Sequence, residues 1–338
     1  MLKVAVVGLG RIGQVHLQNL LFYCPDVEVV GVVDPNEEAL ETTKKFRLEY
    51  VGKDLQELIN KKKLDAVFIC SSTDTHAGFI EMASNAGLHC FCEKPIDMDL
   101  VKVEKILKIV ESNKTKLMVA FNRRFDEGFR QIRNKVQKGD LKDVYTLKIT
   151  SRDPSPPKLS YIHRSGGLFM DMMIHDFDMA RYVVGSEVER VYTLAGNLVD
   201  PIIGESGDVD TAVVVLKFSN GVIGTIENCR QSAYGYDQRV EVHGRGGMLT
   251  TDNLHSNNHQ FYSQQSISKP CLQTFFLERY AQAYRDEVKS FVSSILKDEQ
   301  PSITGHDGLQ AMRLAIAAKK SFDDKKEVLL RDIVASKV

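Results

Sequence analysis

The chain has 338 residues, of which 43% are hydrophobic and 26% are charged. Its 44 basic and 45 acidic residues leave a formal net charge of -1, which gives no global attraction to nucleic acid or to an anionic membrane surface. The length exceeds that of one ordinary hydrophobic core, so we predict two domains, at residues 1–122 and 123–338.

The sequence pattern does not suggest a membrane-spanning or exported protein. It has no apolar run of the roughly 18 residues that a membrane span needs, and a strand-like segment begins at Lys3, where a signal sequence would have its apolar stretch. The six cysteines form no Cys-x-x-Cys pair and have no metal-type spacing with histidine. We therefore expect reduced thiols, no bound metal and a cytoplasmic location.

The N-terminal segment has the pattern of a dinucleotide-binding unit. A continuous apolar run at 3–7, typical of a strand buried on both faces, leads directly into Gly8-Leu9-Gly10-Arg11-Ile12-Gly13. A helical pattern follows, and a second apolar run at 27–33 ends in Asp34, which lies 21 residues after Gly13. Strand, glycine loop, helix, strand and acid in this order are the context that such a loop requires.

Each part of this loop has a mechanical role in binding a dinucleotide. Gly8 permits the tight turn, Gly10 lets the backbone approach the pyrophosphate, and Gly13 lets helix and strand pack closely. The helix that starts at Arg11 and Ile12 presents N–H groups and the positive end of its dipole to the phosphates. We therefore expect all five residues to take part in cofactor binding.

Asp34 sets the choice of cofactor. Its carboxylate can accept hydrogen bonds from both hydroxyls of the adenosine ribose and would repel a 2′-phosphate. Pro35 follows, rather than an arginine or serine that could hold such a phosphate, so we predict NAD rather than NADP. A methyltransferase also combines a glycine loop with an acidic strand end, so hydride chemistry requires further residues.

Strand-like and helix-like segments alternate as far as residue 121, which predicts a doubly wound parallel sheet, a Rossmann domain. Helices are expected at 37–46, 54–61, 75–86 and 100–111, and strands at 66–70, 89–92 and 117–121. Ligands of such sheets bind beyond the carboxyl ends of the strands, where this chain has two polar loops. One loop, with Ser71, Thr73 and His76, either lines the nicotinamide half of the site or only caps the helix at Thr75.

The second polar loop is Glu93-Lys94-Pro95. Pro95 disfavours a helical conformation for Lys94 and keeps it extended at a strand terminus, near the reactive end of the cofactor. A lone lysine in such a place is ordinarily a solvated charge, so the role of Lys94 depends on the groups that it faces.

From residue 144 the pattern changes to strands joined by short turns, which predicts an α+β domain with an open, mainly antiparallel sheet. Strands are expected at 144–151, 188–195, 211–218, 222–229 and 238–243, and helices at 276–296 and 305–321. These C-terminal helices can pack back on the first domain, and the polar stretch 253–269 is expected to be a mobile loop. The open face of the sheet is a plausible surface for homo-oligomer formation.

The segment 166–184 combines a glycine-containing loop with a helix. Asp171, His175 and Asp178 are spaced i, i+4 and i+7, so they share one face of a regular helix. The residues between them are mostly apolar, so this polar face is expected to be half buried and to need partners. It is either an ordinary helix surface with an Asp–His pair or the setting of a general base, whose proton affinity a carboxylate adjusts.

Taken together, these motifs resemble the glucose–fructose oxidoreductase, inositol dehydrogenase and rhizopine catabolism (Gfo/Idh/MocA) family over essentially the whole chain. The resemblance rests on the glycine loop with Asp34, on Glu93-Lys94-Pro95 and on Gly166-Gly167-x₃-Asp171-x₃-His175. It implies that Lys94, Asp171 and His175 are catalytic, with Glu93 and Lys94 also at the cofactor.

Within the family, three segments look most like the inositol 2-dehydrogenases: 151–156, 174–181 and 234–239. The resemblance implies that four residues face the hydroxyls of a polyol: Arg124, Asp153, Asp178 and Tyr236. It also implies homo-oligomers, tetramers or dimers, that form through the open sheet. Met173 stands where the resemblance leads us to expect threonine.

The chemistry of alcohol oxidation agrees with these roles. The hydroxyl proton must leave while the C–H hydride moves to a nicotinamide. His175 suits the base, Asp171 would position the hydroxyl or favour the imidazolium, and Lys94 would stabilise negative charge on the oxygen. We predict NAD-dependent oxidation of myo-inositol to 2-keto-myo-inositol. The alternatives are another sugar or scyllo-inositol dehydrogenase of this family, or a non-catalytic NAD-sensing regulator on the same fold.

Overall fold

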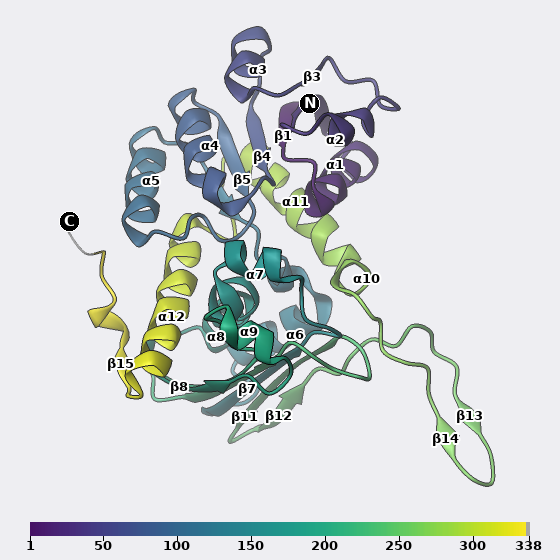
Figure 1. The fold of residues 1–338 in the computed structure, drawn as a ribbon, viewed down its shortest axis with the longest axis vertical. Coiled ribbons are helices and arrows are strands. Elements are labelled where there is room, and N and C mark those ends of the chain that lie inside the picture. Colours follow the sequence, from purple (N-terminus) through teal and green to yellow (C-terminus); the bar gives the residue numbers. More distant parts are fainter. Residues whose placement is uncertain (336–338) are drawn as a thin grey trace. The chain divides into compact units, whose positions relative to one another are not determined.

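The computed structural model describes residues 1–335, which divide into two compact units. The first unit contains Met1–Asn122 and Gln282–Gln310, with Ala335, and the second contains Arg123–Ala281 and Ala311–Val334 (Figure 1). Within residues 1–335, no helix combines the length and the apolar character needed to cross a membrane.

A six-stranded parallel sheet forms the centre of the first unit, in the order β3-β2-β1-β4-β5-β6. The strands are β1 (Leu2–Val7), β2 (Val27–Val33), β3 (Tyr50–Gly52), β4 (Ala66–Ile69), β5 (His89–Cys92) and β6 (Leu117–Val119). Strand β4 is buried at every position, because it is a central strand with both faces covered. This order is the doubly wound arrangement predicted from the sequence, with the change of direction between β1 and β4.

Helices connect these strands. They are α1 (Arg11–Tyr23), α2 (Glu37–Glu41), α3 (Leu55–Lys61), α4 (Thr73–Asn85) and α5 (Leu100–Ser112). Aspartate side chains fix two of the starts: Asp54 accepts hydrogen bonds from the backbone of α3, and Asp99 from the backbone of α5. The helix predicted at 37–46 is shorter than expected. It ends at Glu41 because the hydroxyls of Thr42 and Thr43 bond back to backbone carbonyls, an alternative to continuing the helix.

A segment far along the chain completes the core of the first unit. Helix α11 (Ala281–Leu296) places Phe291 against Phe68 of β4 and Phe91 of β5, with ring centroids 5.5 and 5.8 Å apart. The helix predicted at 276–296 is interrupted at Tyr280, so a short helix α10 (Phe276–Arg279) precedes α11. The reason is local: Tyr280 leaves the helical conformation, with φ -112° and ψ 16°.

The second unit is built on a seven-stranded sheet in the order β12-β11-β7-β10-β9-β8-β15. The strands are β7 (Val144–Arg152), β8 (Val188–Gly196), β9 (Thr211–Phe218), β10 (Ile223–Cys229), β11 (Asp237–Gly244), β12 (Gly247–Thr250) and β15 (Val328–Leu329). The sheet is mainly antiparallel, as predicted, but β7 and β10 pair in parallel. The sequence pattern did not indicate this parallel pair.

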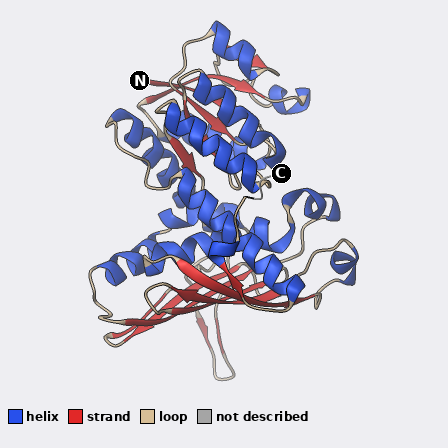
Figure 2. Ribbon diagram, turned by 90° about the vertical axis from the view of Figure 1, so that its left-hand side faces the viewer, coloured by secondary structure: helices blue, strands red, loops and turns tan. Residues whose placement is uncertain are grey.

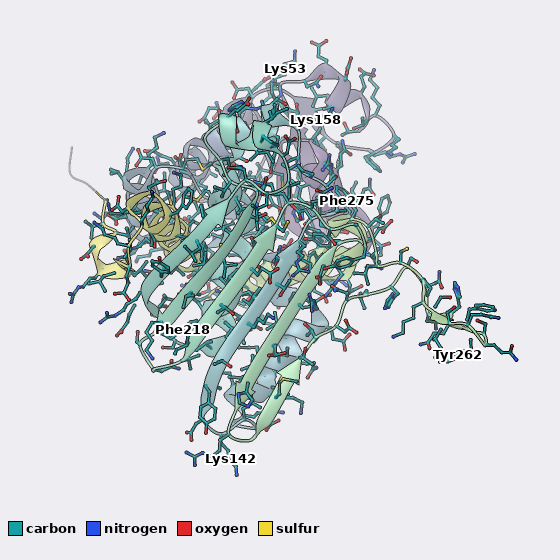
Figure 3. The ribbon with its side chains drawn as sticks, turned by 60° about the horizontal axis from the view of Figure 1, so that its bottom comes forward. Lys53, Lys142, Lys158, Phe218, Tyr262 and Phe275 are labelled. Carbon is teal, nitrogen blue, oxygen red and sulfur yellow. The ribbon has the colours of Figure 1, made fainter. Side chains whose placement is uncertain are left out.

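Helices of the second unit lie on one face of this sheet (Figure 2). They include α6 (Glu127–Gln137), α8 (Ile174–Val184), α9 (Pro201–Glu205) and most of α12 (Gly305–Asp324). The other face is open: Val213 and Val215 of β9 are exposed, while Val214 and Leu216 between and beyond them are buried (Figure 3). The alternation of the strand residues therefore divides the sheet into a core face and a solvent face, as the sequence predicts.

Part of the stretch expected to be a mobile loop forms a two-stranded hairpin, β13 (Phe261–Tyr262) with β14 (Ile267–Ser268). The turn is closed by Ser263, whose backbone N–H donates to Ser266 and whose hydroxyl accepts from the N–H groups of Gln265 and Ser266. Figure 3 shows Tyr262 of this hairpin extending away from the strands of the sheet. A serine turn thus orders a polar segment that has no apolar pattern of its own.

Candidate active site

The glycine loop of the first unit is shaped by close approaches of its backbone. Gly8 has φ +88°, and a Cβ there would lie 2.5 Å from the backbone of Ser71. A Cβ on Gly13 would lie 2.0 Å from the carbonyl oxygen of Gly8. At Gly10, in contrast, nothing lies within 4 Å of the Cβ position, so the backbone is open to a ligand. The three positions therefore fit the predicted turn, packing and pyrophosphate roles.

The start of α1 and the end of β2 meet at this loop. Helix α1 begins at Arg11 with no side-chain cap on its first N–H groups, which fits a phosphate in that place. The Asp34 carboxylate, 8% exposed, accepts hydrogen bonds from the backbone N–H of Leu9 at 2.6 Å and of Asn36 at 2.8 Å. Since a carboxylate has about four acceptor positions, two remain for ribose hydroxyls.

The loop after β4 is connected to the segment after β5 through His76. One nitrogen of its buried ring lies 2.8 Å from the carbonyl oxygen of Pro95, and the other lies 3.1 Å from that of Ser71. Helix α4 begins at Thr73, and neither Ser72 nor Thr75 caps it with its side chain, because the Thr75 hydroxyl donates to the Ser72 carbonyl. Capping therefore does not account for this polar loop, and its contact with the cofactor stays a prediction.

Lys94 lies two residues after the end of β5, and its peptide bond to Pro95 is cis. The preceding Glu93 is half-buried, and its carboxylate lies 2.8 Å from Nε2 of His16. The two residues therefore lie at the carboxyl end of a central strand, as predicted, and their catalytic and cofactor roles stay predictions.

The segment with Asp171 and His175 is not one regular helix as predicted. After α7 (Leu159–Ser165) comes a π-helical turn, η2 (Leu168–Met172), in which Met173 N–H donates to the Leu168 carbonyl at 2.9 Å. Helix α8 then begins at Ile174. The wide turn holds Asp171, whereas His175 lies in the first turn of α8, so the three polar residues do not follow one helical repeat.

Asp171 is half-buried and has defined partners in the second unit. The Tyr161 hydroxyl donates to its Oδ1 at 2.8 Å, and Nη1 of Arg230 lies 3.7 Å from its Oδ2. His175 is also half-buried. Met173, between them, is fully buried, so its side chain belongs to the core. The exchange of the expected threonine for methionine therefore changes packing behind the site.

Arg230 is the functional candidate that the sequence analysis missed. Its side chain is only 1% exposed and lies between two carboxylates, 3.7 Å from Asp171 and 3.7 Å from Asp208. Its Nε and Nη2 have no hydrogen-bond partner among the described residues. Buried donors are costly unless they are satisfied, so this guanidinium has unused capacity to bind a ligand or to hold the carboxylates around it.

Asp153 lies next to Arg230 because of the parallel pair. In the register of β7 and β10, Arg152 faces Cys229, and the Asp153 N–H donates to the Cys229 carbonyl at 3.0 Å. Burial raises the pKa of Asp153 to about 6; Arg230 and Arg123 oppose this shift, and Asp171 adds to it. A sheet read as antiparallel would not have placed these strand ends side by side, so the neighbourhood of Asp153 could not be predicted.

Arg124 and Asp178 form a buried pair with each other. Nε and Nη2 of Arg124 donate to the two carboxylate oxygens of Asp178 at 2.8 and 2.6 Å. Asp178 is 1% exposed, and the guanidinium lies over the ring of Tyr182. The structure thus brings together two of the residues predicted to bind substrate, and their contact with a polyol stays a prediction.

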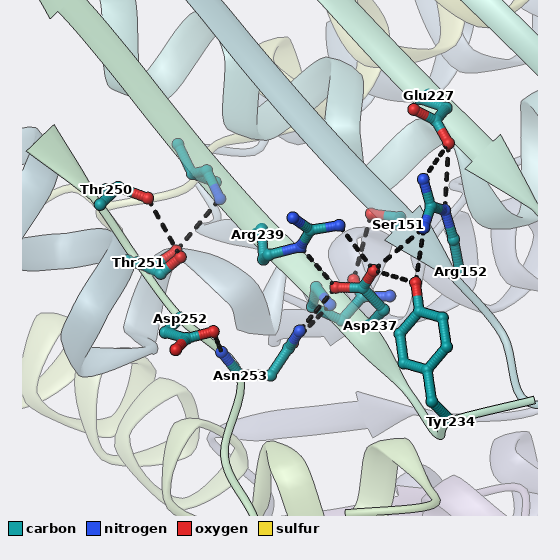
Figure 4. Close-up of polar contacts among 12 residues, drawn as sticks. Ser151, Arg152, Glu227, Tyr234, Asp237, Arg239, Thr250, Thr251, Asp252 and Asn253 are labelled. Carbon is teal, nitrogen blue, oxygen red and sulfur yellow. Dashed lines mark hydrogen bonds and ion pairs between the residues drawn. The ribbon is translucent and has the colours of Figure 1, made fainter. Parts of the chain in front are cut away.

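Tyr236 stands just before β11, beside a network of charged groups. Asp237 is completely buried and accepts hydrogen bonds from Tyr234, Arg239 and Asn253 (Figure 4). Tyr236 itself is buried, and burial raises its pKa well above the usual value. A phenol that stays protonated can donate to a ligand oxygen as well as accept.

The first unit has a parallel sheet with an open glycine loop and an acidic strand end, and the second unit carries Asp171 and His175 beside its own sheet. Together these features define a dinucleotide-dependent oxidoreductase. The chain belongs to the GFO/IDH/MocA family. Residues 2–121 match the oxidoreductase family with an NAD-binding Rossmann fold, and residues 129–250 match the GFO/IDH/MocA C-terminal domain. The cofactor of the first unit is therefore NAD, as predicted.

Relatives and solved structures agree over the full length. The chain is 42% identical to myo-inositol 2-dehydrogenase of Thermotoga maritima, over 98% of this chain and 100% of the relative. It is 41% identical to inositol 2-dehydrogenase of Rhizobium meliloti, over 96% and 98% of the two chains. Scyllo-inositol dehydrogenase of Lactobacillus casei, solved with NAD(H) and scyllo-inositol bound, superposes with a TM-score of 0.92 at 30% identity, covering 98% and 99%.

Asp153→Asn should stabilise the protein at alkaline pH. The folded pKa of Asp153, about 6, exceeds that of an unfolded aspartate, about 4. The folded state therefore holds this proton more tightly, and the resulting stability is present below about pH 4 and is lost as the pH rises through about 6. Near pH 8 we expect the asparagine variant to unfold with a free energy about 1–3 kcal/mol higher than that of the wild type.

Denaturant unfolding at several pH values measures this difference for Asp153→Asn. Glu189→Gln, a neutralisation at an exposed position of the same unit, is the matched control and should show no such pH dependence. The prediction would be wrong if the unfolding free energies of Asp153→Asn and the wild type differed by the same amount near pH 4 and near pH 8.

Arg230→Gln should raise the pKa of Asp153 further, by about one unit, because it removes the nearby positive charge that opposes the effect of burial. Arg230→Lys keeps the positive charge and should change the pKa of Asp153 less, although lysine lacks the planar guanidinium group. The titration of the Asp153 carboxyl carbon by NMR measures both. An unchanged pKa in Arg230→Gln would show that the guanidinium does not act on Asp153.

Proposed function

We propose that this oxidoreductase is an inositol 2-dehydrogenase, which oxidises a secondary hydroxyl of myo-inositol to the ketone 2-keto-myo-inositol with NAD. One observation carries the proposal: the Lys94, Asp171 and His175 motif positions are all present in a chain that is 42% identical, over its full length, to a myo-inositol 2-dehydrogenase. A regulator that had lost its chemistry would have no need to keep these three groups.

Each of the three residues has a distinct task. When bound, NAD supplies the acceptor for the hydride. His175 takes the proton of the substrate hydroxyl as general base, and Asp171, oriented by Tyr161 and Arg230, favours the imidazolium that forms. Lys94, at the end of β5, donates a hydrogen bond to the substrate oxygen and stabilises its developing negative charge.

Polar groups of the second unit suit a substrate with many hydroxyls. Asp153 and Asp178 are acceptors, Arg124 is a donor, and the phenol of Tyr236 can act as both. The Arg124–Asp178 pair uses one lone pair on each of the two carboxylate oxygens, and each of these oxygens has a second lone pair. A site of this kind discriminates against substrates that lack a hydroxyl, because its buried polar groups would then stay unpaired.

We further infer a homo-oligomer, a tetramer or a dimer, that forms through the open face of the second sheet. The support is a set of exposed apolar side chains on these strands: Tyr192, Leu194, Val213, Val215 and Ile223. Exposed apolar groups that gather on one face are typical of a protein interface. We also propose a cytoplasmic location, since all six cysteines are free thiols.

A side-by-side assay of myo-inositol, scyllo-inositol and glucose, each with NAD and with NADP, tests the substrate. We expect NADH formation with the highest kcat/KM for myo-inositol and little reaction with NADP, because Asp34 would repel the 2′-phosphate. A higher kcat/KM for scyllo-inositol would identify the alternative function, which the Lactobacillus casei relative exemplifies. Preference for glucose, or no turnover of any polyol, would contradict the proposal.

His175→Ala should lower kcat by about 10²–10⁴-fold and leave the affinity for NAD nearly unchanged, because a positioned base acts in the chemical step. Steady-state kinetics and a direct NAD-binding titration measure the two effects. The matched control is His163→Ala, which removes an exposed imidazole of α7 in the same unit. Normal turnover by His175→Ala would show that the base is another group.

A further inference from the structure

The first unit contains a buried acid–base cluster of three residues, two of which, His16 and Glu287, have no part in the proposed reaction. It consists of His16 of α1, Glu93 at the end of β5 and Glu287 of α11. Nε2 of His16 lies 2.8 Å from Oε1 of Glu93 and 3.9 Å from Oε1 of Glu287. The side chains of His16 and Glu287 have no exposed surface, so water does not solvate the imidazole or this carboxyl group.

With both carboxylates ionised and a neutral imidazole, this cluster would place two negative charges close together, and a bound cation or a proton would reduce that charge. Both carboxylate oxygens of Glu287 lack a hydrogen-bond partner. The titratable groups that face Glu287 are His16, Glu93 and the buried thiol of Cys70, none of which is a permanent cation. Burial, and then the negative charge of Glu93, raise the pKa of Glu287 well above its usual value.

The geometry fits a proton better than a metal ion. Nε2 lies 2.8 Å from the Glu93 carboxylate, and because an ionised carboxylate only accepts hydrogen bonds, the tautomer that suits this contact carries its N–H at Nε2. A metal-bound histidine normally donates its other N–H to a partner, but Nδ1 of His16 has no hydrogen-bond partner among the described residues. The ring is instead held by edge contacts with Phe91 and Tyr284, at centroid distances of 5.0 and 5.8 Å.

We propose that His16 is a positioning residue that fixes Glu93, and with it the Lys94 segment, and that Glu287 stays a neutral carboxylic acid so that His16 bonds to Glu93 alone. An ionised Glu287, whose Oε1 lies 3.9 Å from the same nitrogen, would compete for the imidazole N–H and weaken the hydrogen bond to Glu93. The cluster thus links the helix that follows the glycine loop to the segment that carries Lys94. The effect on turnover rests on the proposed role of Lys94; the protonation of Glu287 does not.

The protonation of Glu287 is tested through stability and pH, without any substrate. The folded state holds this proton more tightly than the unfolded chain, so the stability from Glu287 is lost as the pH rises towards its raised pKa. Glu287→Gln cannot lose a proton. We therefore expect its Tm, relative to that of the wild type, to increase by about 2 °C or more between about pH 5 and about pH 8.

Asp286→Asn is the matched control, since it neutralises the neighbouring carboxylate at the surface of the same helix, where Asp286 accepts from Gln282. Its Tm difference from the wild type should not change with pH in this way. An infrared band of a protonated carboxylic acid, present in the wild type at neutral pH and missing from Glu287→Gln or Glu287→Met, gives a second measurement if one variant does not fold. A pH-independent Tm difference, or no such band, would overturn the proposal, as would a stoichiometric metal ion in the purified protein.

The positioning role of His16 is tested by the split between turnover and cofactor binding. His16→Leu removes the hydrogen bond to Glu93, so we expect kcat to fall about tenfold, while the Kd for NAD rises by a smaller factor, because the glycine loop and Asp34 are unchanged. His16→Gln offers an N–H at a similar distance and should recover most of the rate. Equal losses for leucine and glutamine, or a loss of NAD binding in proportion to kcat, would show that His16 only packs α1. If neither the wild type nor any variant oxidises a polyol, the proposed function is wrong. The Tm experiment still decides whether Glu287 is protonated.

Discussion

The arrangement of the second unit depends on one parallel pair in an otherwise antiparallel sheet. Because β7 and β10 run in the same direction, their carboxyl ends lie together, and Asp153 and Arg230 follow these two strands. Arg230 then lies between Asp171 of the π-helical turn and Asp208, whose carboxylate accepts from the backbone of Leu168 at the start of that turn. If the pair were antiparallel, Arg230 and Asp153 would lie at opposite ends of these two strands.

Behind this group, a second layer of buried polar contacts holds the helix that carries His175. Asp176 is completely buried and accepts hydrogen bonds from Arg123, Ser151 and Asn228. Such buried ion pairs add little net stability, because the cost of removing charges from water offsets their attraction. These contacts instead fix the orientation of α8 relative to the sheet. Ser151 lies on β7 and Asn228 on β10, so α8 is attached to the same two strands that lead into Asp153 and Arg230. A site held this way keeps its groups in place without a large movement on binding.

The sequence was sufficient to predict those parts of the fold in which the local residue pattern agrees with the tertiary structure. The glycine loop, Asp34 and the alternating strands of the first unit follow rules of spacing and burial, and the six-stranded sheet agrees with them. Three features of the candidate site did not follow from such rules. The π-helical turn at Asp171 has no signature in a helical repeat, the parallel β7–β10 pair depends on contacts far apart in the chain, and Arg230 becomes visible only once that pair is known. His16 was hidden in the same way, because its partner Glu287 lies 271 residues further along the chain.

The carboxyl groups of half-buried Asp153 and fully buried Glu287 show how the same physical cause leads to different chemical states. Burial is the largest effect on the pKa of both Asp153 and Glu287, and it raises both. Two arginines, Arg230 and Arg123, oppose the shift at Asp153 and hold its pKa at about 6, so it is largely ionised at neutral pH. At Glu287 no cation within residues 1–335 opposes the shift of the pKa, and the negative charge of Glu93 adds to it. The chain thus keeps an ionised acceptor at Asp153, beside Arg230, and a neutral acid at Glu287, where a second charge would weaken the hydrogen bond between His16 and Glu93. The presence or absence of a neighbouring arginine decides between these states.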